Sequence, residues 1–375
     1  MRIAIDSLPL LAHAGGKSYL SSLLKHLFKI DKSNDYFLFF RTLKSFSFKK
    51  QFNYPENVSF HRIAIPNRLL EFLWTKNDFY IPYTESFFLN PDVYFATMYF
   101  SPVFAKCSIV AVVYDLTVLK YEGYKENAKI FDMRLKNMIK RAKYIISISE
   151  YTKKDLCEHY QVNPDKVFVT PLAADERFKV IEDKEKIIKV KSKYKITNEY
   201  ILYVGNLGPH KNLVRLIKVF EKLKKVYRIS HKLLLCGKKY WGGEVVDKIK
   251  SLFLEDEVLL LDYVPDEDLP YLYNGADVFV YISLYEGFGL PVLEAMNCGT
   301  AVVASNTTSL PEVVRDGGVL VNPIDEEEIL GAILKVLSDK AFRNKLSEKA
   351  LSVSRNFNWD KTAKLTLDVF KRAVL

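Results

Sequence analysis

The stretch SLYEGFGLPVLEAM, residues 283–296, decides the fold, because it has the pattern of a strand-to-helix loop built to hold an anion. Pro291 suits the first position of a helix. Gly287 and Gly289 would let the backbone approach a ligand closely. The amides around Gly289 and Leu290, at the positive end of the helix behind them, would then bind a phosphate group.

Two carboxylates accompany this loop. Glu286 lies in the loop and Glu294 follows eight residues later, on the first turn of the expected helix. Both can point at one ligand, and carboxylates accept hydrogen bonds from sugar or ribose hydroxyls. The alternative is that Glu294 only favours a helix N-terminus electrostatically and that Glu286 is solvated. The glycines, the proline and both carboxylates together favour a binding site.

A second loop of the same kind is GNLGPHKN, residues 205–212, again between an expected strand and an expected helix. Lys211 stands at the predicted start of that helix. A fixed lysine beside helix amides would stabilise the negative charge that grows on a departing diphosphate. A single lysine at a helix start is usually a surface residue, but its place at the same sheet edge as the first loop favours a function. His210 either assists at the phosphates or lies exposed.

Around these loops, short apolar runs alternate with segments of helical period, which predicts an α/β protein with parallel sheets. The pattern runs twice and predicts two Rossmann-like domains that face an interdomain cleft. Ligands bind such sheets at the carboxyl ends of the strands. The predicted domains are 1–175 and 199–357, joined by a Lys- and Glu-rich linker, 176–198. The predicted strands are Arg2–Asp6, Tyr36–Phe40, Val58–Ile63, Val93–Ala96, Ser108–Val113, Tyr144–Ser147, Lys166–Val169, Tyr200–Val204, Lys232–Cys236, Glu257–Leu261, Asp277–Tyr281 and Thr300–Ala304, and the predicted helices include Glu150–Tyr160 and Lys211–Lys225.

The chain resembles glycosyltransferase family 4, the retaining enzymes of GT-B fold, and within it a mannosyltransferase-like group. The resemblance covers most of the chain and is strongest over 200–323. It is carried by EGFGLPVLEAM with its two glutamates, YVGNLGPHKNL, DYVPDEDLPYLYNGADVFVYIS, CGTAVVASNTTSLPEVVRDGGVLVNP, RAKYIISISEYTKKDL, VFVTPLAAD and FNWDKTAKLTLDVFKRAV. The last of these is similar to the C-terminal helix, about 358–375, that returns to the first domain in that fold.

The resemblance implies a donor site for a nucleotide-sugar. Carried over by position, it implies that the transferred sugar contacts Glu286 and the amides of Phe288 and Gly289, and that the ribose contacts Glu294. It also implies that the diphosphate contacts Leu290 and Lys211, and that the base contacts the backbone of Tyr263 and Val264. Gly15 and Gly16 would close over the phosphates.

Two positions depart from the family's pattern. Asn206 stands where many relatives carry an arginine, so positive charge at the leaving group is reduced unless His210 or Lys17 supplies it. Tyr114 stands where many relatives carry a histidine that contacts the sugar. Asp115 remains, and we expect it to contribute to the site, with helix capping or loop bracing as the alternative.

The expected activity is therefore transfer of a hexose, mannose or glucose, to a glycan or lipid-linked acceptor with retention of configuration. In the family's usual mechanism, the donor phosphate accepts the acceptor's proton. We expect no metal and no other cofactor, because lysine and helix ends can supply the positive charge. The alternatives are a nucleotide-sugar epimerase of the same fold and a catalytically weak nucleotide-sugar-binding module. Binding of nucleic acid is suggested only by charge, with no motif behind it.

Composition fits this expectation. The 375 residues exceed what one core usually supports, and 49% hydrophobic with 27% charged residues is typical of a globular protein. The four cysteines form no CxxC pair, and no apolar run has the length of a membrane span. The N-terminus has the pattern of a strand rather than a signal peptide. We therefore expect a cytoplasmic protein. The aromatic-rich stretch 68–104 and the segment 46–50 suggest peripheral contact with an anionic membrane on its inner face; core packing is the alternative.

Overall fold

The computed structural model describes residues 1–11, 15–43, 54–76, 83–99, 102–238 and 243–375. It divides into two compact units. The first unit is Met1–Leu172 with Asn358–Leu375, and the second unit is Ala173–Phe357. The segment 176–198, predicted as a linker, is grouped with the second unit and contains a helix, α7 (Lys184–Lys193).

The first unit is built on a seven-stranded sheet in which every described pairing is parallel. The strand order is β3-β2-β1-β4-β5-β6-β7. The central strands are almost wholly buried, as expected for a parallel sheet covered on both faces. The strands are β1 (Arg2–Asp6), β2 (Asp35–Arg41), β3 (Val58–Ile63), β4 (Val93–Ala96), β5 (Ser108–Val113), β6 (Tyr144–Ser147) and β7 (Val167–Val169).

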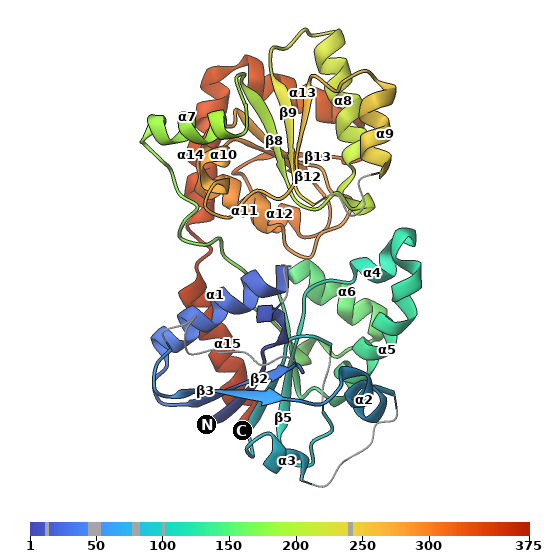
Figure 1. Ribbon diagram of the computed structural model, residues 1–375, viewed down its shortest axis with the longest axis vertical. Coiled ribbons are helices and arrows are strands. Elements are labelled where there is room, and N and C mark those ends of the chain that lie inside the picture. The colour runs from blue at the N-terminus through green and yellow to red at the C-terminus, as the bar shows by residue number, and fades with distance from the viewer. Residues whose placement is uncertain (12–14, 44–53, 77–82, 100–101, 239–242) are drawn as a thin grey trace. The chain divides into compact units, whose positions relative to one another are not determined.

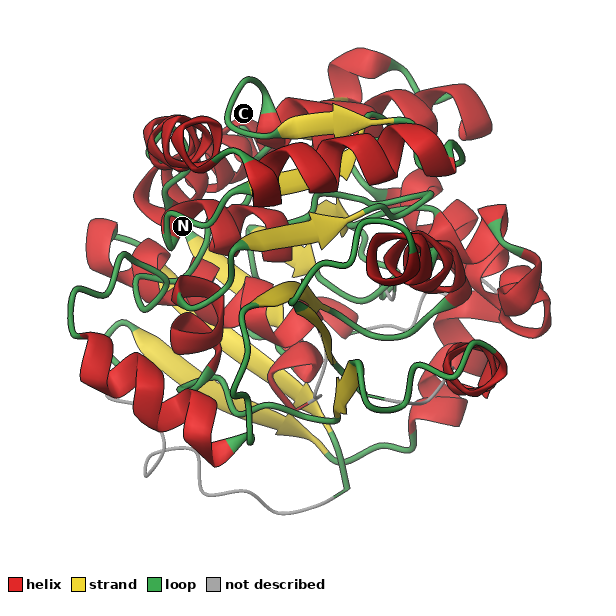
Figure 2. Ribbon diagram, turned by 90° about the horizontal axis from the view of Figure 1, so that it is seen from above, coloured by secondary structure: helices red, strands yellow, loops and turns green. Residues whose placement is uncertain are grey.

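Helices flank this sheet (Figures 1 and 2). The C-terminal helix α15 (Trp359–Val374) belongs to the first unit, although it follows the second in sequence. It packs beside α1 (Gly15–Ile30), where Asp360 Oδ1 lies 2.6 Å from His26 Nδ1. The other helices are α2 (Asn67–Leu70), α3 (Thr84–Phe87), α4 (Thr117–Lys120), α5 (Lys125–Arg141) and α6 (Glu150–Tyr160), the last with the predicted bounds.

The second unit holds a six-stranded sheet, also parallel in every described pairing, in the order β10-β9-β8-β11-β12-β13. From β8 the chain proceeds outward to β10 and then returns to β11 on the other side of β8. The strand order therefore reverses between β8 and β11, the kind of point at which such sheets bind ligands. The strands are β8 (Tyr200–Val204), β9 (Lys232–Cys236), β10 (Val258–Leu261), β11 (Val278–Tyr281), β12 (Val302–Ser305) and β13 (Val319–Val321).

One helix of the second unit was predicted with bounds, and its start differs at the site. The helix predicted over Lys211–Lys225 begins two residues later, as α8 (Leu213–Lys225). The strand β13 was not predicted. The other helices are α9 (Gly243–Ser251), α10 (Leu269–Asn274), α11 (Leu290–Asn297), α12 (Leu310–Val314), α13 (Glu326–Ser338) and α14 (Lys340–Ser354). The prediction of two Rossmann-like domains with parallel sheets is confirmed.

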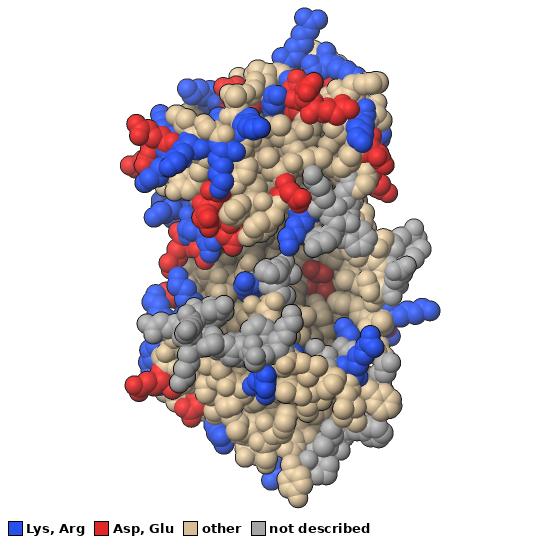
Figure 3. All heavy atoms as spheres, in the orientation of Figure 1, with Lys and Arg blue, Asp and Glu red and all other residues tan. Residues whose placement is uncertain are grey.

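The chain carries a net charge of +10. On the described part of the face shown in Figure 3, Lys and Arg are interspersed with Asp and Glu. Such mixing is typical of a solvated surface. Within the described residues, no helix combines the length and the apolar character that crossing a membrane requires.

Candidate active site

Lys211 lies in the interior of the second unit, not on its surface. Residues Pro209–Lys211 form a single 3-10 turn, and Asn212 then adopts a left-handed conformation (φ 61°) before α8 begins. Asparagine tolerates this conformation better than most residues. The prediction that Lys211 starts the helix was therefore wrong by two residues. The turn leaves Lys211 only 7% exposed.

Asn212 joins the two predicted loops. Its side-chain amide donates hydrogen bonds to the carbonyl oxygens of Ile282 (3.1 Å) and Pro323 (2.6 Å). The backbone amide of Leu284 donates to the carbonyl oxygen of His210 at 2.8 Å. The loop after β8 is thus fixed against the loop after β11, side by side at the carboxyl edge of the sheet.

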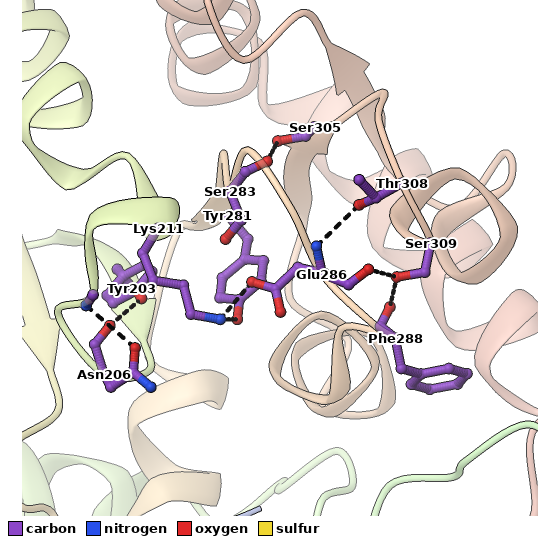
Figure 4. A network of polar contacts seen from close by, with 11 residues as sticks. Tyr203, Asn206, Lys211, Tyr281, Ser283, Glu286, Phe288, Ser305, Thr308 and Ser309 are labelled. Atoms are coloured by element: carbon purple, nitrogen blue, oxygen red, sulfur yellow. Dashed lines mark hydrogen bonds and ion pairs between the residues drawn. The ribbon is translucent and has the colours of Figure 1, made fainter. Parts of the chain in front are cut away.

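Lys211 and Glu286 meet at this edge (Figure 4). The Lys211 Nζ atom lies 2.5 Å from Glu286 Oε1 and donates to the Tyr281 hydroxyl at 3.0 Å. Glu286 is 9% exposed, so this is a buried ion pair. The Tyr281 ring stacks between Phe279 and Tyr203, with centroids 5.7 and 5.6 Å away. The stack holds the hydroxyl, and so the ammonium, in a defined place.

The backbone of the Glu286 loop is held by two hydroxyl side chains that follow β12. The Glu286 amide donates to Thr308 Oγ1 at 3.1 Å. The Ser309 hydroxyl lies 3.0 Å from the carbonyl oxygens of both Glu286 and Phe288. These contacts position the carboxylate independently of its ion pair (Figure 4).

Gly289 sets the start of α11. Its φ is +107°, and a Cβ atom there would lie 2.5 Å from Leu310 Cδ2. Only glycine fits this position without a shift of the neighbouring side chain. The helix begins at Leu290, one residue before the predicted start, so Pro291 is its second residue. The amides of its first turn therefore point out of the same loop that carries Glu286.

Electrostatics within the site are dominated by burial and by the ion pair. Burial would raise the pKa of Glu286, but the Lys211 ammonium beside it holds that pKa below its usual value. Burial, reinforced by the charge of Lys211, lowers the pKa of His210 to about 4. His210 is therefore neutral near pH 7 and adds no positive charge to the site.

Glu294 behaves differently. Burial raises its pKa to about 8, assisted by Asp266 and opposed by the Tyr273 hydroxyl, which donates to Oε2 at 2.8 Å. Its side chain is therefore largely protonated near pH 7 and keeps a carbonyl oxygen as an acceptor. Burial raises the pKa of Tyr281, and the charges of Glu286 and Glu294 raise it further.

The two residues predicted to bind the base lie at the same carboxyl edge of the second sheet. So does Asn206, which stands where many relatives carry an arginine. Tyr263 and Val264 follow β10; Tyr263 is exposed, with Lys238 Nζ 5.8 Å from its ring centroid, and Val264 is buried. Asn206 is exposed, and its Oδ1 accepts a hydrogen bond from the Gly208 amide at 3.2 Å. Asn206 therefore shapes its own loop.

In the first unit, the predicted residues lie at the carboxyl ends of β1 and β5. Gly15 is the first residue of α1, and Gly16 and the exposed Lys17 follow it. Asp115 Oδ1 accepts a hydrogen bond from the Thr117 amide at 2.8 Å, at the start of α4. This contact is the loop-bracing geometry that was the alternative for Asp115.

Tyr114 is anchored within the first unit. Its hydroxyl donates to the Thr97 carbonyl oxygen at 3.2 Å, and its ring meets the Tyr19 ring edge-on, with centroids 5.3 Å apart. The surface hollow of this unit that is lined by Asp92, Lys106 and Ser108 lies at the amino ends of β4 and β5. It is at the opposite edge of the first unit's sheet from Tyr114.

The structure thus brings together Lys211, His210 and Glu286 in one network, with Glu294 on the adjoining helix. Sequence reasoning missed Tyr281 and Asn212, which hold this network. A signal was present for each. Tyr281 is the last residue of a strand that leads into a predicted ligand loop, and Asn212 ends a loop rich in turn residues.

Comparison with known proteins places the chain in a family. The model of the family described as glycosyl transferases group 1 matches residues 183–353, most of the second unit. O-antigen chain mannosyltransferase B from Escherichia coli is 33% identical over 266 residues, 70% of this chain and 70% of that protein. Serotype-specific mannosyltransferase WbdA from Escherichia coli is 34% identical over 70% of this chain, which spans 33% of WbdA.

Among solved structures, HepE from Anabaena in complex with UDP-glucose has a TM-score of 0.75. The similarity covers 99% of this chain and 100% of that chain, at 18% sequence identity. At this identity the likeness concerns the fold, which both proteins share over their whole length.

Proposed function

The chain belongs to the glycosyl transferases group 1 family, and on that premise we propose that it transfers a hexose, mannose or glucose, from a nucleoside diphosphate donor to a glycan acceptor. It is a glycosyltransferase by family. Mannose is favoured as the sugar by the names of its relatives, O-antigen chain mannosyltransferase B and WbdA.

One observation carries the proposal: a buried lysine and a buried glutamate are paired at the point where the strand order of the second sheet reverses. A buried ion pair is a costly arrangement in a protein interior, and it is weak evidence for stability. It makes sense where both charges have a second partner. We propose that Lys211 turns to the diphosphate and Glu286 to the hydroxyls of the transferred sugar when the donor binds.

The proposed mechanism uses these groups without a protein nucleophile. As the bond from the sugar to the diphosphate loosens, negative charge grows on the leaving phosphate, and Lys211 stabilises it. A donor phosphate oxygen accepts the acceptor's proton, so the new bond forms on the face that the leaving group vacates and configuration is retained. A retaining hydrolase instead needs two carboxyl groups about 5 Å apart across the scissile bond. Here Glu286 is engaged by an ammonium.

The remaining contacts are proposals from the family's pattern. We propose that the amides of Phe288, Gly289 and Leu290 bind the sugar and diphosphate, because α11 begins there. The other proposed contacts are the ribose at Glu294, the base at the Tyr263 and Val264 backbone, and the phosphates at Gly15 and Gly16. Asp115 is proposed to act through the loop that it braces.

Peripheral membrane contact stays a proposal of this kind. In the aromatic-rich stretch, Trp74 and Phe88 are buried in the core of the first unit, as the alternative held, whereas Phe72, Tyr83 and Phe87 are exposed. The segment 46–50, and Phe79 and Tyr80, lie outside the described residues. Co-sedimentation with vesicles that contain anionic lipid tests the contact, and absence of binding would dismiss it.

The test of function is a donor screen with the purified chain. Mannose and glucose linked to GDP or UDP are offered with a mannose-terminated oligosaccharide, and release of the nucleoside diphosphate is measured. We expect release with one donor and a product whose anomeric configuration, determined by NMR, matches that of the donor. Epimerised donor without nucleotide release would support an epimerase instead, and binding without turnover would support a binding module.

The same assay tests the proposal that no metal takes part in the transfer. Because Lys211 and the start of α11 supply positive charge, we expect the rate to be unchanged by EDTA. Loss of activity with EDTA that Mg²⁺ restores would contradict the proposal.

A further inference from the structure

Three potential metal ligands meet at the amino edge of the second sheet. Glu199, His231 and Asp277 are the residues that immediately precede β8, β9 and β11. These strands are neighbours in the order β9-β8-β11, with Tyr200 paired to Lys232 and Ile201 to Val278. The parallel register therefore places the three side chains side by side.

The cluster is separate from the proposed active site. Lys211 and Glu286 follow the carboxyl ends of β8 and β11, whereas these ligands stand before their amino ends. With five residues in β8 at about 3.3 Å each, the two edges lie roughly 16 Å apart. A ligand at one edge would not touch the residues at the other.

The distances suit a small transition-metal ion. His231 Nε2 lies 3.3 Å from Asp277 Oδ2 and 3.7 Å from Glu199 Oε2. One ligand atom from each residue can be chosen so that all three lie within 4.8 Å of one another. Nitrogen and oxygen ligands about 2.0–2.2 Å from a tetrahedral zinc ion lie about 3.4 Å apart. His231 and Asp277 already have this spacing, and the exposed Glu199 side chain would have to shift to reach it.

The histidine lacks other partners. His231 is 8% exposed, and apart from the contacts of Nε2 with these two carboxylates neither ring nitrogen has a described hydrogen-bond partner. Buried polar atoms are rarely left without a partner, and a metal ion bound at Nε2 would satisfy one of these two. The second oxygen of Asp277 is already engaged, because Arg343 Nη1 lies 2.9 Å from Oδ1. An outer partner on the non-ligating oxygen is a common feature of metal-binding carboxylates.

From this geometry we propose that Glu199, His231 and Asp277 form a binding site for a divalent transition-metal ion such as zinc. An imidazole ligand selects zinc, nickel or copper over magnesium and calcium, which prefer oxygen ligands alone. Three protein ligands leave a fourth position for water. The bound ion links the starts of three neighbouring strands, so its effect is to stabilise the second unit rather than to take part in transfer.

Zinc alone is the probe for the test. We expect the metal-stripped wild-type chain to bind one zinc ion, measured by competition with a chromophoric chelator. At a zinc concentration a hundred times its dissociation constant, the unfolding temperature should rise by about 5 °C or more. Mg²⁺ should produce neither effect. A wild-type chain that binds no zinc, or one that unfolds at the same temperature with zinc, would overturn the proposal.

Variants separate this site from adventitious binding. His231→Ala should abolish the stoichiometric zinc, and Glu199→Gln, at an exposed position that should not affect folding, should weaken binding by about 10-fold or more. The matched control is His159→Ala, an exposed histidine of α6, which should bind zinc like the wild type. Equal zinc binding by all four chains would show an adventitious ion only. It would also leave the cluster as a polar contact between His231 and the two carboxylates.

Discussion

Replacing Lys211 by methionine tests the buried ion pair through protein stability, without any donor. Methionine keeps the length of the side chain and removes its charge, so Glu286 is left in the interior without a cation. Removing one partner of a buried pair costs about 3–5 kcal/mol. In a unit of this size, 1 kcal/mol shifts the unfolding temperature by about 2–4 °C. We therefore expect the transition of the second unit to fall by about 10 °C at pH 7.

The pH dependence distinguishes a lost charge pair from lost packing. In the wild type, the pKa of Glu286 lies below its unfolded value of about 4.3. Ionised Glu286 therefore contributes stability that is present above about pH 4.3 and is lost as the pH falls through the folded pKa. In Lys211→Met, burial raises the pKa of Glu286, so stability is lost as the pH rises instead. The difference between the two chains should be large at pH 7 and small at pH 4.

Differential scanning calorimetry at pH 4 and pH 7 measures this difference. The double variant Lys211→Met with Glu286→Leu removes both charges, and it should regain most of the lost stability, because apolar replacements of buried pairs are often neutral. A Lys211→Met chain that unfolds at the wild-type temperature would refute the reasoning. A loss of the same size at both pH values would also refute it, since packing alone would then explain the effect.

Three further outcomes follow from the same site. Lys211→Ala should lower kcat by about 10²–10³, the typical effect of removing one group that stabilises leaving charge; Lys218→Ala, an exposed lysine of α8, is the matched control in a nucleotide-release assay and should stay fully active. Gly289→Ala should destabilise the chain by about 1–3 kcal/mol in urea denaturation, because of its φ and the contact with Leu310, whereas Gly331→Ala, where a Cβ meets nothing within 4 Å, should not. Because its pKa is raised in the folded state, neutral Glu294 contributes stability at acid pH that the wild type loses as this carboxyl ionises. The free energy of unfolding of Glu294→Gln should therefore rise relative to that of the wild type as the pH increases from about 5 through 8. A constant difference between the two chains over that range would contradict this.

Periodicity predicted most of the fold. Every strand that was predicted forms, within one or two residues of the predicted bounds. The unpredicted strand, Val319–Val321, has only three residues and follows the glycine pair of RDGG. Its apolar run is too short to be recognised as a strand from the sequence. The start of α8 was misplaced because the left-handed conformation of Asn212 leaves no trace in helical periodicity.

The candidate site was predictable in its members but not in its pairing. The loops that hold Lys211 and Glu286 were each visible as strand-to-helix turns, yet the two residues are 75 positions apart, and their contact depends on the order of β8 and β11. The cluster of Glu199, His231 and Asp277 was invisible for a related reason, since no local spacing connects its members. Both are consequences of strand order, which residue patterns specify only indirectly.

The role of Lys211 at the leaving group can be measured most directly by comparing how the chain binds a nucleoside and its diphosphate. Calorimetric titration of the wild type with guanosine, GDP, uridine and UDP gives the affinity that the diphosphate adds. We predict that Lys211→Ala reduces this added affinity by at least about 10-fold and leaves nucleoside binding unchanged, while Lys218→Ala changes neither. If the ratio of diphosphate affinity to nucleoside affinity is the same in Lys211→Ala as in the wild type, Lys211 does not bind the donor's diphosphate.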